Sequence, residues 1–372
     1  MQKLVPLLLD WFATNARDLP WRRTRDPYAI WVSEIMLQQT QVKTVIPFWN
    51  RWMKELPTIE AAAKAPSAKI HKLWEGLGYY TRVRNLQKAA RVIVTKHGGK
   101  FPENFDDVLA LPGIGHYTAG AICSIAFNQP TPILDGNVIR VLTRIFGIAK
   151  NPKEKETNQL LWQIAEDLVS RAKNTKEAKA EFTSQPSQPS RDITSCSHLN
   201  QSLMELGALV CSPRNPQCPV CPVKNLCVAF KENRVEELPN LGKREAATAR
   251  RFVAFVIERN GKFLVRQRPA GVVNAHLWEF PNAEINGAKL DVPQIFKSEF
   301  GTELEKISPL CTVKHSITRY RIKLEAFSVP LEKFPTKMAG RWVAARDFDS
   351  LAFSSAHKKL ASAAAKSILS GR

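Results

Sequence analysis

The spacing of apolar residues along the first part of the chain predicts helices. In residues 1–170, apolar side chains recur three and four positions apart, as in Ile30–Val42 and Leu160–Val169, and proline and glycine separate the segments. The pattern stops at 171–197, which is polar, rich in serine, glutamine and proline, and almost free of large apolar residues. We expect a disordered or extended insertion there. The helical spacing returns in Leu199–Leu209.

The periodicity changes near Phe252. Short strand-like runs such as "FVAFVIER", "KFLVRQR" and "YRIKLEAFSV" follow, with a helix-like "VPQIFKSEFG" between them. This alternation is typical of an α+β domain, and the charged stretch before it is typical of a linker. The predicted organisation is therefore a mainly helical domain over 1–230, a linker over 231–250 and an α+β domain over 251–372.

Charge narrows the range of partners. The 372 residues include 54 Lys and Arg against 34 Asp and Glu, a net charge of +20, and both domains share the excess. A surplus of this size favours nucleic acid, because each neutralised phosphate releases counterions. Charge alone leaves open a merely soluble basic protein. No apolar run reaches membrane-spanning length, and Leu4–Leu9 is too short for a signal-peptide core, so we expect an intracellular protein.

Four of the seven cysteines fall close together. Cys211, Cys218, Cys221 and Cys227 are separated by six, two and five residues, and four thiolates in a compact loop are typical of a [4Fe–4S] cluster. A structural zinc site usually takes two closely spaced pairs, and only Cys218 and Cys221 form such a pair. The spacing therefore favours an iron–sulfur cluster, with zinc as the alternative, and indicates a reducing compartment.

The segment Leu111–Gly120, "LPGIGHYTAG", places Gly113 and Gly115 in a tight turn at the head of a helix. Free backbone N–H groups and the helix dipole at such a turn bind phosphate, and a purely structural turn is the alternative. Asp135 stands just ahead of the next predicted helix. An aspartate there is most often an N-cap, but its place between the glycine turn and the cysteine cluster favours a catalytic carboxylate.

These motifs together resemble those of the MutY family of adenine DNA glycosylases, in the helix–hairpin–helix (endonuclease III) superfamily. Three further segments carry the resemblance: Leu19–Val42, Leu73–Leu86 and Leu199–Cys211. It implies a mainly α helix–hairpin–helix glycosylase domain with a [4Fe–4S] loop and a C-terminal Nudix-like domain that inspects 8-oxoguanine. It also implies the activity, in which a monomer releases adenine mispaired with 8-oxoguanine or guanine in double-stranded DNA during base excision repair.

The resemblance assigns two carboxylates to the chemistry. Glu34 is expected to protonate adenine N7, and ionised Asp135 to stabilise the positive charge that grows on the sugar, as in glycosidases. A buried Glu34 keeps its proton near neutral pH, whereas a solvent-facing helical glutamate is the alternative. The other implied site residues are Asn137 and Tyr117, which orient the site, and Trp21, Arg22 and Gln201, which line the base pocket.

Excision requires the adenine to leave the base stack, so a side chain must fill or prop the gap. The wedging positions of the family correspond to Gln38, Gln39 and Tyr79, while Gly113 and Gly115 are expected to bind the DNA backbone. For Tyr79 the alternative is a core aromatic residue beside the tyrosine that follows it.

Two departures limit the implied activities. Relatives that also cut the DNA backbone carry a lysine where this chain has Tyr117, so the resemblance implies a glycosylase without strong lyase activity. In "QIFKSEFGTEL", most carboxylates of a working Nudix hydrolase are replaced, by Ile295 and Ser298 among others, and Glu299 and Gly301 remain. A Nudix hydrolase needs several carboxylates to hold magnesium, so we expect no hydrolysis by this domain.

The lesion-reading loop of the family commonly reads Phe-Ser-His, and the aligned residues here are Ile317, Thr318 and Arg319. Thr318 retains a hydroxyl group and is the expected contact to 8-oxoguanine. Two other functions remain as alternatives. An endonuclease III-like bifunctional glycosylase/lyase is disfavoured by Tyr117 and the extra domain, and a non-catalytic DNA-binding protein is disfavoured by the two implied carboxylates.

Overall fold

The chain divides into two units by its internal contacts. The computed structural model describes residues 3–180, 195–243, 245–285, 290–304, 306–317, 319–330 and 339–369. The first unit combines Met1–Lys64 with Asn85–Arg244, and the second combines Ala65–Arg84 with Glu245–Arg372. Among the residues described, no helix is long and apolar enough to cross a lipid bilayer.

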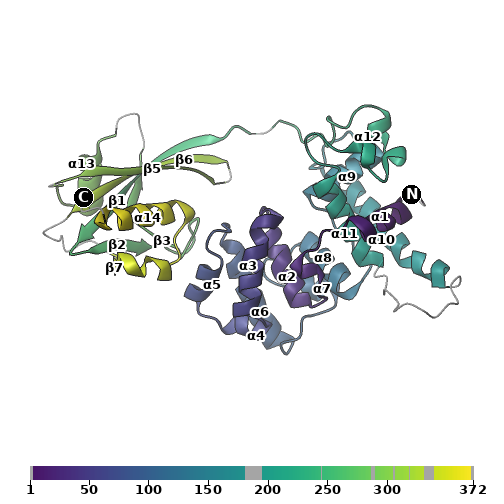
Figure 1. The fold of residues 1–372 in the computed structure, drawn as a ribbon, viewed down its shortest axis with the longest axis horizontal. Coiled ribbons are helices and arrows are strands. Elements are labelled where there is room, and N and C mark those ends of the chain that lie inside the picture. Colours follow the sequence, from purple (N-terminus) through teal and green to yellow (C-terminus); the bar gives the residue numbers. More distant parts are fainter. Residues whose placement is uncertain are drawn as a thin grey trace. The chain divides into compact units, whose positions relative to one another are not determined.

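The first unit is helical, as the apolar spacing predicts (Figure 1). Its α-helices are α1 (Leu4–Asn15), α2 (Pro27–Leu37), α3 (Val42–Glu55), α4 (Ile59–Lys64), α6 (Thr81–Lys96), α7 (Phe105–Leu109), α8 (His116–Phe127), α9 (Gly136–Phe146), α10 (Lys155–Ala180), α11 (Ser195–Leu209) and α12 (Val228–Lys231). Short 3₁₀ turns are η1 (Pro20–Arg22), η2 (Cys218–Val220) and η3 (Lys224–Leu226). The first residues of α6, up to Arg84, belong to the second unit.

The second unit is an α+β domain. Its strands are β1 (Thr248–Arg259), β2 (Lys262–Gln267), β3 (Trp278–Glu279), β4 (Asn282–Glu284), β5 (Ser308–Ile317), β6 (Tyr320–Pro330) and β7 (Arg341–Ala344), and its helices are α5 (Ser67–Leu73), η4 (Ala345–Ser350), α13 (Val292–Phe300) and α14 (Ser355–Leu369). The strand order is β3–β2–β1–β6–β5, with β4 also paired to β1 and β7 to β2. Only β1 and β6 pair in parallel among these strands.

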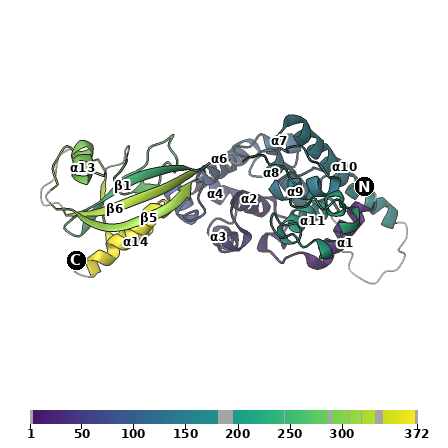
Figure 2. The same cartoon turned by 90° about the horizontal axis from the view of Figure 1, so that it is seen from above.

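The two faces of this sheet carry separate cores. Phe255 of β1 packs with Phe296 of α13, whereas its neighbours Ala254 and Val256 pack in the cluster that contains Leu360 of α14. Alternate residues of a strand point to opposite faces, so α13 and α14 cover opposite sides of the sheet (Figure 2).

The segment Ala65–Arg84 makes its contacts outside the domain that the sequence boundaries assign to it. It lies within the predicted helical domain over 1–230, yet contacts place it with Glu245–Arg372 in the second unit. Its apolar residues Ile70, Leu73 and Trp74 are buried.

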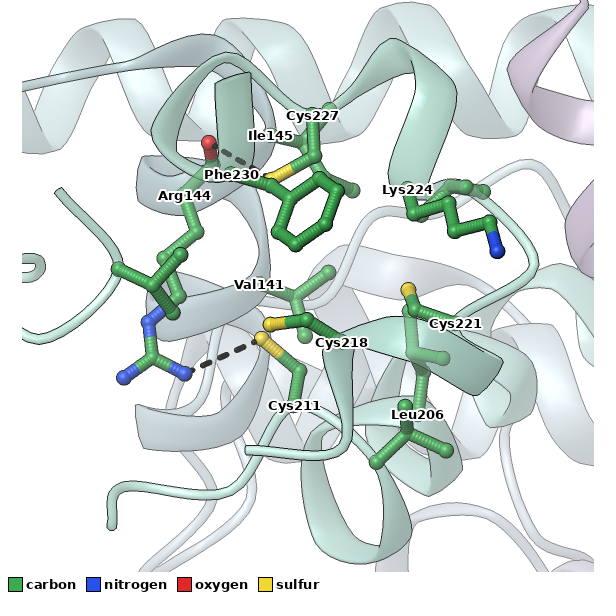
Figure 3. Close-up of a pocket in the computed structure, with 13 residues that line it drawn as sticks. Val141, Arg144, Ile145, Leu206, Cys211, Cys218, Cys221, Lys224, Cys227 and Phe230 are labelled. Carbon is green, nitrogen blue, oxygen red and sulfur yellow. Dashed lines mark hydrogen bonds between the residues drawn. The ribbon is translucent and has the colours of Figure 1, made fainter. Parts of the chain in front are cut away.

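The residues after α11 form the cysteine loop, which we define as residues 211–227. The loop passes through η2 and η3 and ends at α12, which packs against α9. Figure 3 shows its cysteine side chains gathered with Val141 and Ile145 of α9 around one pocket.

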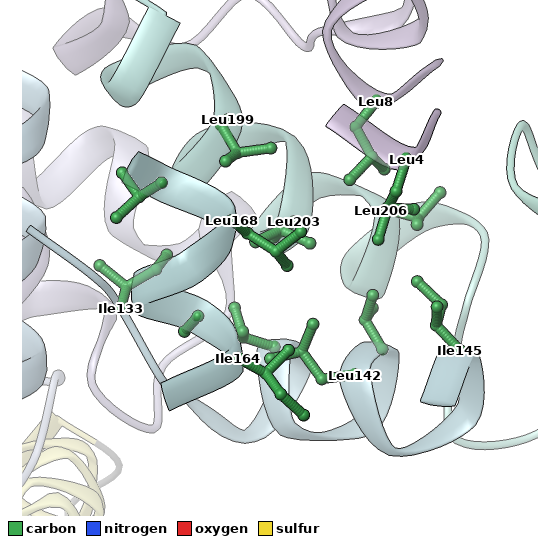
Figure 4. Packing of buried hydrophobic residues seen from close by; sticks show 14 of the residues in the cluster. Leu4, Leu8, Ile133, Leu142, Ile145, Ile164, Leu168, Leu199, Leu203 and Leu206 are labelled. Carbon is green, nitrogen blue, oxygen red and sulfur yellow. The ribbon is translucent and has the colours of Figure 1, made fainter. Parts of the chain in front are cut away.

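Helix α11 is central to the core of the first unit, because it packs against α1, α8, α9 and α10. Leu199, Leu203 and Leu206 of α11 share one buried cluster with Leu4 and Leu8 of α1 (Figure 4). Fully burying one leucine contributes about 1.5–3 kcal/mol. This cluster therefore fixes α11 against α9, and both helices carry residues of the site described below.

Helix α10 is longer than the sequence pattern predicts. It continues through residues 171–180, and α11 begins at Ser195, so both ends of the expected insertion at 171–197 are helical. The expectation of a disordered or extended segment is therefore wrong for these ends. The reason is local: "RAKNTKEAKA" lacks large apolar residues but is rich in alanine and lysine, which have high helix propensity. Residues 181–194 lie outside the described residues.

Candidate active site

A cavity of about 650 Å³ opens in the first unit, where η1, α2, the start of α8, the start of α9 and α11 meet. Its lining includes these residues expected at the site: Trp21, Arg22, Glu34, Gln38, Gln39, Tyr117, Asp135, Asn137 and Gln201. Segments far apart in the sequence therefore converge on one place. Tyr79 belongs to the second unit, and Thr318 lies outside the described residues.

Glu34 is buried in the third turn of α2, with 5% of its surface exposed. Burial raises the pKa of its carboxyl group to about 7, and the nearby Asp135 acts in the same direction. The Tyr117 hydroxyl donates a hydrogen bond of 2.9 Å to Glu34 Oε2, which lowers the pKa and partly offsets the effect of burial. A solvent-facing Glu34 is therefore excluded. The side chain is able to hold or release a proton near neutral pH.

Asp135 is both the N-cap of α9 and a cavity residue. Its Oδ1 accepts a hydrogen bond of 2.7 Å from the Val138 N–H, and its Oδ2 accepts one of 3.1 Å from Asn137 Nδ2. Burial raises the pKa of Asp135, whereas these hydrogen bonds lower it. The sequence presents an N-cap and a catalytic carboxylate as alternatives. In the structure the cap residue also lines the cavity, and the capping hydrogen bond fixes the direction in which its carboxylate points.

A chain of hydrogen bonds links Asp135 to the cysteine loop. Asn137 Oδ1 accepts a hydrogen bond of 2.9 Å from the guanidinium group of Arg140. The same guanidinium group donates hydrogen bonds of 2.7 Å each to the carbonyl oxygens of Gly207 and Cys211. Gly207 allows this approach, because a Cβ there would lie 2.7 Å from the Cβ of Asn137. The position of the Asp135 carboxylate thus depends on where the cysteine loop begins.

Two of the three expected base-pocket residues, Trp21 and Gln201, are buried, and Arg22 is partly buried. Trp21 is 6% exposed and packs edge-on against Trp49 at 6.0 Å between ring centroids. Gln201 lies on α11 and donates a hydrogen bond of 3.0 Å to Ser197 Oγ. Both line the same cavity as Glu34.

Glu205 is a cavity residue that the sequence analysis missed. Its side chain is 1% exposed and receives hydrogen bonds of 2.7 Å from Arg17 and 2.9 Å from Arg22. Burial alone acts to raise its pKa, but the guanidinium groups, Arg17 more than Arg22, hold it at about 2. The available signal is a lone acid in the apolar run "LMELGALV": a buried charge requires a partner, and two arginines elsewhere in the chain supply it.

The glycine turn before α8 has the conformation that its sequence predicts. Gly113 has φ of +80°, and a Cβ there would lie 2.5 Å from the Cβ of Asn85, so only glycine fits. Gly115 is the N-cap residue of α8 and contributes no capping side chain. Unpaired N–H groups of a first helical turn attract anions.

Two of the expected wedge residues have an unusual backbone. Gln39 has φ of +57° and Tyr79 has φ of +47°, values that are uncommon for residues other than glycine. The Tyr79 side chain is 42% exposed, whereas the neighbouring Tyr80 is buried, so Tyr79 is not a core aromatic residue. Gln38 lies near Thr118, with 3.4 Å from Nε2 to Oγ1. Such strained positions cluster at functional sites.

Four thiols of the cysteine loop line one pocket (Figure 3). Cys211, Cys218, Cys221 and Cys227 are all free of disulfides, and the rest of the wall is mostly apolar, with Arg144 and Lys224 as its basic members. The buried guanidinium group of Arg144 donates a hydrogen bond of 3.4 Å to Cys211 Sγ. Within the described residues, no three or more His, Cys, Asp or Glu side chains are arranged to hold a single metal ion. The donor set, four soft thiols in a mostly apolar wall with two basic side chains, fits an iron–sulfur cluster.

The helix that corresponds to a Nudix catalytic helix lacks a group of carboxylates. Ile295 and Ser298 lie on α13, and the helix ends at Gly301 with φ of +70°. Glu299, which remains, forms an ion pair of 3.2 Å with Arg266. Its charge is therefore compensated by the protein itself.

The fold and the cavity define a class of protein. Residues 32–167 match the model of the HhH-GPD superfamily of base excision DNA repair proteins, and residues 252–363 match that of the NUDIX domain. A solved structure of a thermostable thymine-DNA glycosylase is similar, with 31% identity, a TM-score of 0.52, and coverage of 62% of this chain and 97% of that chain. The chain thus has a helix–hairpin–helix glycosylase fold followed by a Nudix-like domain, and the predicted fold class is confirmed.

Full-length relatives narrow the class further. The adenine DNA glycosylase of Rattus norvegicus is 34% identical, covering 95% of this chain and 76% of the relative. The adenine DNA glycosylase of Buchnera aphidicola subsp. Schizaphis graminum is 33% identical, and the match covers 86% of this chain and 82% of the relative. The chain belongs to the adenine DNA glycosylase family, which confirms the resemblance drawn from its motifs.

Proposed function

We propose that this protein, as a monomer, hydrolyses the N-glycosidic bond of adenine mispaired with 8-oxoguanine or guanine in duplex DNA, within base excision repair. The observation that carries the proposal is the shared cavity of Glu34 and Asp135, in which burial brings the pKa of Glu34 to about 7. Two carboxylates with different protonation states are the apparatus for breaking a glycosidic bond. The net charge of +20 supports a DNA substrate.

The two carboxylates take different roles in this reaction. Protonated Glu34 gives its proton to N7 of the adenine and so makes the base a better leaving group. Asp135 stays ionised and stabilises the cationic sugar until a water molecule adds to C1′ and releases a proton to solvent, which completes the hydrolysis. The oxygens of Asp135 are held by Val138 and Asn137, so little reorganisation is needed as the charge develops. Trp21, Arg22 and Gln201 line the pocket for the flipped adenine.

DNA contacts outside the pocket bring the adenine to it. The N-terminus of α8 beyond Gly113 and Gly115 binds a backbone phosphate. Gln38, Gln39 and Tyr79 fill or prop the gap that the flipped base leaves, since an inserted aromatic ring recovers part of the lost stacking.

Tyr117 supports base release without strand cleavage. A lyase step needs an amine nucleophile, and Tyr117 is a phenol whose hydroxyl hydrogen bonds to Glu34. Burial raises the pKa of Tyr117 well above its usual value, so the phenol stays neutral. An endonuclease III-like glycosylase/lyase is therefore the weaker candidate.

Cys211, Cys218, Cys221 and Cys227 are proposed to hold a [4Fe–4S] cluster. When bound, the cluster supplies cross-links that fix the cysteine loop, rather than a chemical step on the DNA. The spacing of the four thiols and their common pocket support it. Zinc is the alternative, and metal analysis of the purified protein separates the two.

The Nudix-like domain is proposed to inspect the base opposite the adenine, with Thr318 as its contact to 8-oxoguanine. Hydrolysis of nucleotides by this domain is not part of the proposal, because the carboxylates required for magnesium are replaced. Thr318→Ala, in the full-length protein, is expected to narrow the preference for the 8-oxoguanine mispair over the guanine mispair.

One assay tests the proposal as a whole. Purified protein in excess is mixed with duplexes containing A:8-oxoguanine, A:G or thymine glycol, and product is followed over a single turnover. Adenine release from the first two, with strand breaks only after alkali, is expected. Cleavage of the thymine glycol duplex without alkali favours the bifunctional enzyme, and binding without base release favours a non-catalytic protein.

A further inference from the structure

The exposed Tyr79 side chain stands on a segment that folds with the Nudix-like domain. Ala65–Arg84 and Glu245–Arg372 form one compact unit, although the residues that flank the segment in sequence belong to the other unit. The contacts inside this unit show how the segment is held.

Glu75 is the centre of these contacts. Its side chain is 5% exposed. Oε1 accepts a hydrogen bond of 3.1 Å from the N–H of Phe353. Oε2 accepts one of 2.5 Å from the ammonium group of Lys358 and one of 2.8 Å from that of Lys72. Burial alone acts to raise the pKa of Glu75, but these bonds, that of Lys358 first, keep it below its usual value. Glu75 is therefore an ionised, buried carboxylate whose main partners lie more than 270 positions away in the chain.

Other contacts of the segment reach the same domain. Lys72 Nζ donates a hydrogen bond of 3.1 Å to the carbonyl oxygen of Leu351, and the Arg84 guanidinium group donates one of 3.2 Å to the carbonyl oxygen of Ala275. The rings of His71 and His276 stack at 6.3 Å between centroids. The attachment thus flanks Tyr79 on both sides in the sequence.

The turn between Glu75 and Tyr79 transmits this attachment. The indole N–H of Trp74 donates a hydrogen bond of 3.0 Å to the carbonyl oxygen of Gly78, and the Arg82 guanidinium group donates one of 3.1 Å to the same oxygen. The Arg82 guanidinium group also lies over the rings of Trp74 and Tyr79, at 5.4 and 5.5 Å. These contacts connect the Gly78 carbonyl and the Tyr79 ring to Trp74, which directly precedes Glu75, and Tyr79 follows Gly78 at a positive φ.

We propose that Glu75 is a positioning residue through which the Nudix-like domain holds Tyr79 in the conformation that enters DNA. Recognition of the opposite base and insertion of the wedge then belong to one folded unit. The functional half of this statement rests on the proposed role of Tyr79. The attachment itself is a property of the free protein and is tested without any substrate.

Hydrogen exchange of the full-length protein without DNA tests the attachment. Glu75→Gln keeps an acceptor for the Phe353 N–H but removes the charge, and Lys358→Met removes one partner of that charge. Both variants are expected to exchange roughly tenfold faster or more in peptides covering 70–84. Lys359→Met is the matched control, because it removes an exposed lysine from the same helix. Unchanged exchange at 70–84 in both variants overturns the proposal.

A double-variant comparison tests the consequence for the reaction. Extrusion of the target base, reported by 2-aminopurine fluorescence, and the single-turnover rate are measured for Glu75→Gln, Tyr79→Ala and the two combined. Because Glu75 acts through Tyr79, the combination is expected to match Tyr79→Ala alone, whereas a merely structural role predicts multiplied losses, which overturn the proposal. If wild-type protein releases no adenine, the proposed function fails instead, and the exchange result still decides the attachment.

Discussion

The hydroxyl group of Tyr117 donates a 2.9 Å hydrogen bond to Oε2 of Glu34. It joins the first turn of α8 to the third turn of α2, so the glycine turn proposed to bind DNA and the proposed acid are one contact apart. Burial raises the pKa of Glu34 and this bond lowers it, and the balance is about 7. The protonation state of Glu34 is therefore set by a pair of residues rather than by Glu34 alone.

Glu34→Gln is expected to abolish adenine release and to leave DNA binding largely intact, because it removes the transferable proton and preserves the shape. General acid catalysis contributes about 10²–10⁴-fold. Single-turnover rates and a binding isotherm on the same duplex measure the two effects. A variant that keeps more than about a tenth of the wild-type rate contradicts the assignment, since the acid step is worth at least 10²-fold.

The same variant is expected to be more stable than wild type at alkaline pH. A carboxyl group whose folded pKa is raised contributes stability below its unfolded pKa, and that contribution is lost as the pH rises through about 7. Glutamine carries no charge, so the variant is expected to gain about 1–3 kcal/mol at pH 8 and to show a gain that shrinks toward pH 4. Urea unfolding at the two pH values checks this. An equal gain at both pH values speaks against a titrating Glu34.

Tyr117→Phe is expected to shift the alkaline limb of the rate–pH profile upward. The variant removes the hydrogen bond that lowers the pKa of Glu34, so the protonated acid persists to higher pH. Met204→Leu is the control, because Met204 also contacts the Tyr117 hydroxyl, at 3.2 Å, without touching the proton of Glu34. A limb that moves downward, or moves equally in the control, contradicts the pairing.

Asp135→Asn separates the two roles of Asp135. Asparagine is an equally good N-cap, so the free energy of unfolding is expected to change by less than about 1 kcal/mol. The cationic sugar then faces a neutral amide, and the rate is expected to fall by about 10² or more. Asp26→Asn, at the N-cap of α2, makes the same change outside the cavity and is expected to keep its rate. A loss of stability without a loss of rate returns Asp135 to a purely capping role.

Glu205→Gln is expected to destabilise the protein by about 2–4 kcal/mol at pH 7, because it leaves the guanidinium groups of Arg17 and Arg22 without their counter-charge. Arg17 is about one-third exposed, so the expected loss lies below the roughly 3–5 kcal/mol typical of breaking a fully buried pair. A carboxylate with a lowered pKa stabilises the fold above its unfolded pKa, and the effect is lost as the pH falls through about 2. Denaturant unfolding at pH 7 and pH 3 measures both; a difference that does not shrink on acidification contradicts the ion-pair account.

Cys218→Ser is expected to lose iron, visible absorbance, stability and DNA affinity together, because a ligand in a metal-organised loop is coupled to folding. Cys311→Ser, which changes a partly buried cysteine of the second unit, controls for loss of a thiol. If the wild-type protein contains stoichiometric zinc and no iron, the cluster assignment is wrong and the cysteine loop holds zinc instead.

Features that are local in sequence were predictable, and those formed by distant residues were not. The positive φ of Gly113 and the cap at Asp135 follow from a few neighbouring residues. Glu205 and Arg17 are 188 positions apart, and no spacing rule connects them before the fold is known. The assignment of Ala65–Arg84 to the second unit is hidden for the same reason: its apolar spacing is helical, and only its partners show which core it joins.

That distant partnership sets an order of events during biosynthesis. Glu75 and Lys358 are 283 positions apart, and a ribosome adding roughly 5–20 residues per second needs on the order of 15–60 s to travel between them. During this interval the helices on either side of the segment emerge and collapse, while the turn that carries Tyr79 lacks the residues of the second unit against which it packs. A nascent chain interrupted before α14 therefore carries both carboxylates of the cavity, but the segment that bears Tyr79 has not yet acquired its support.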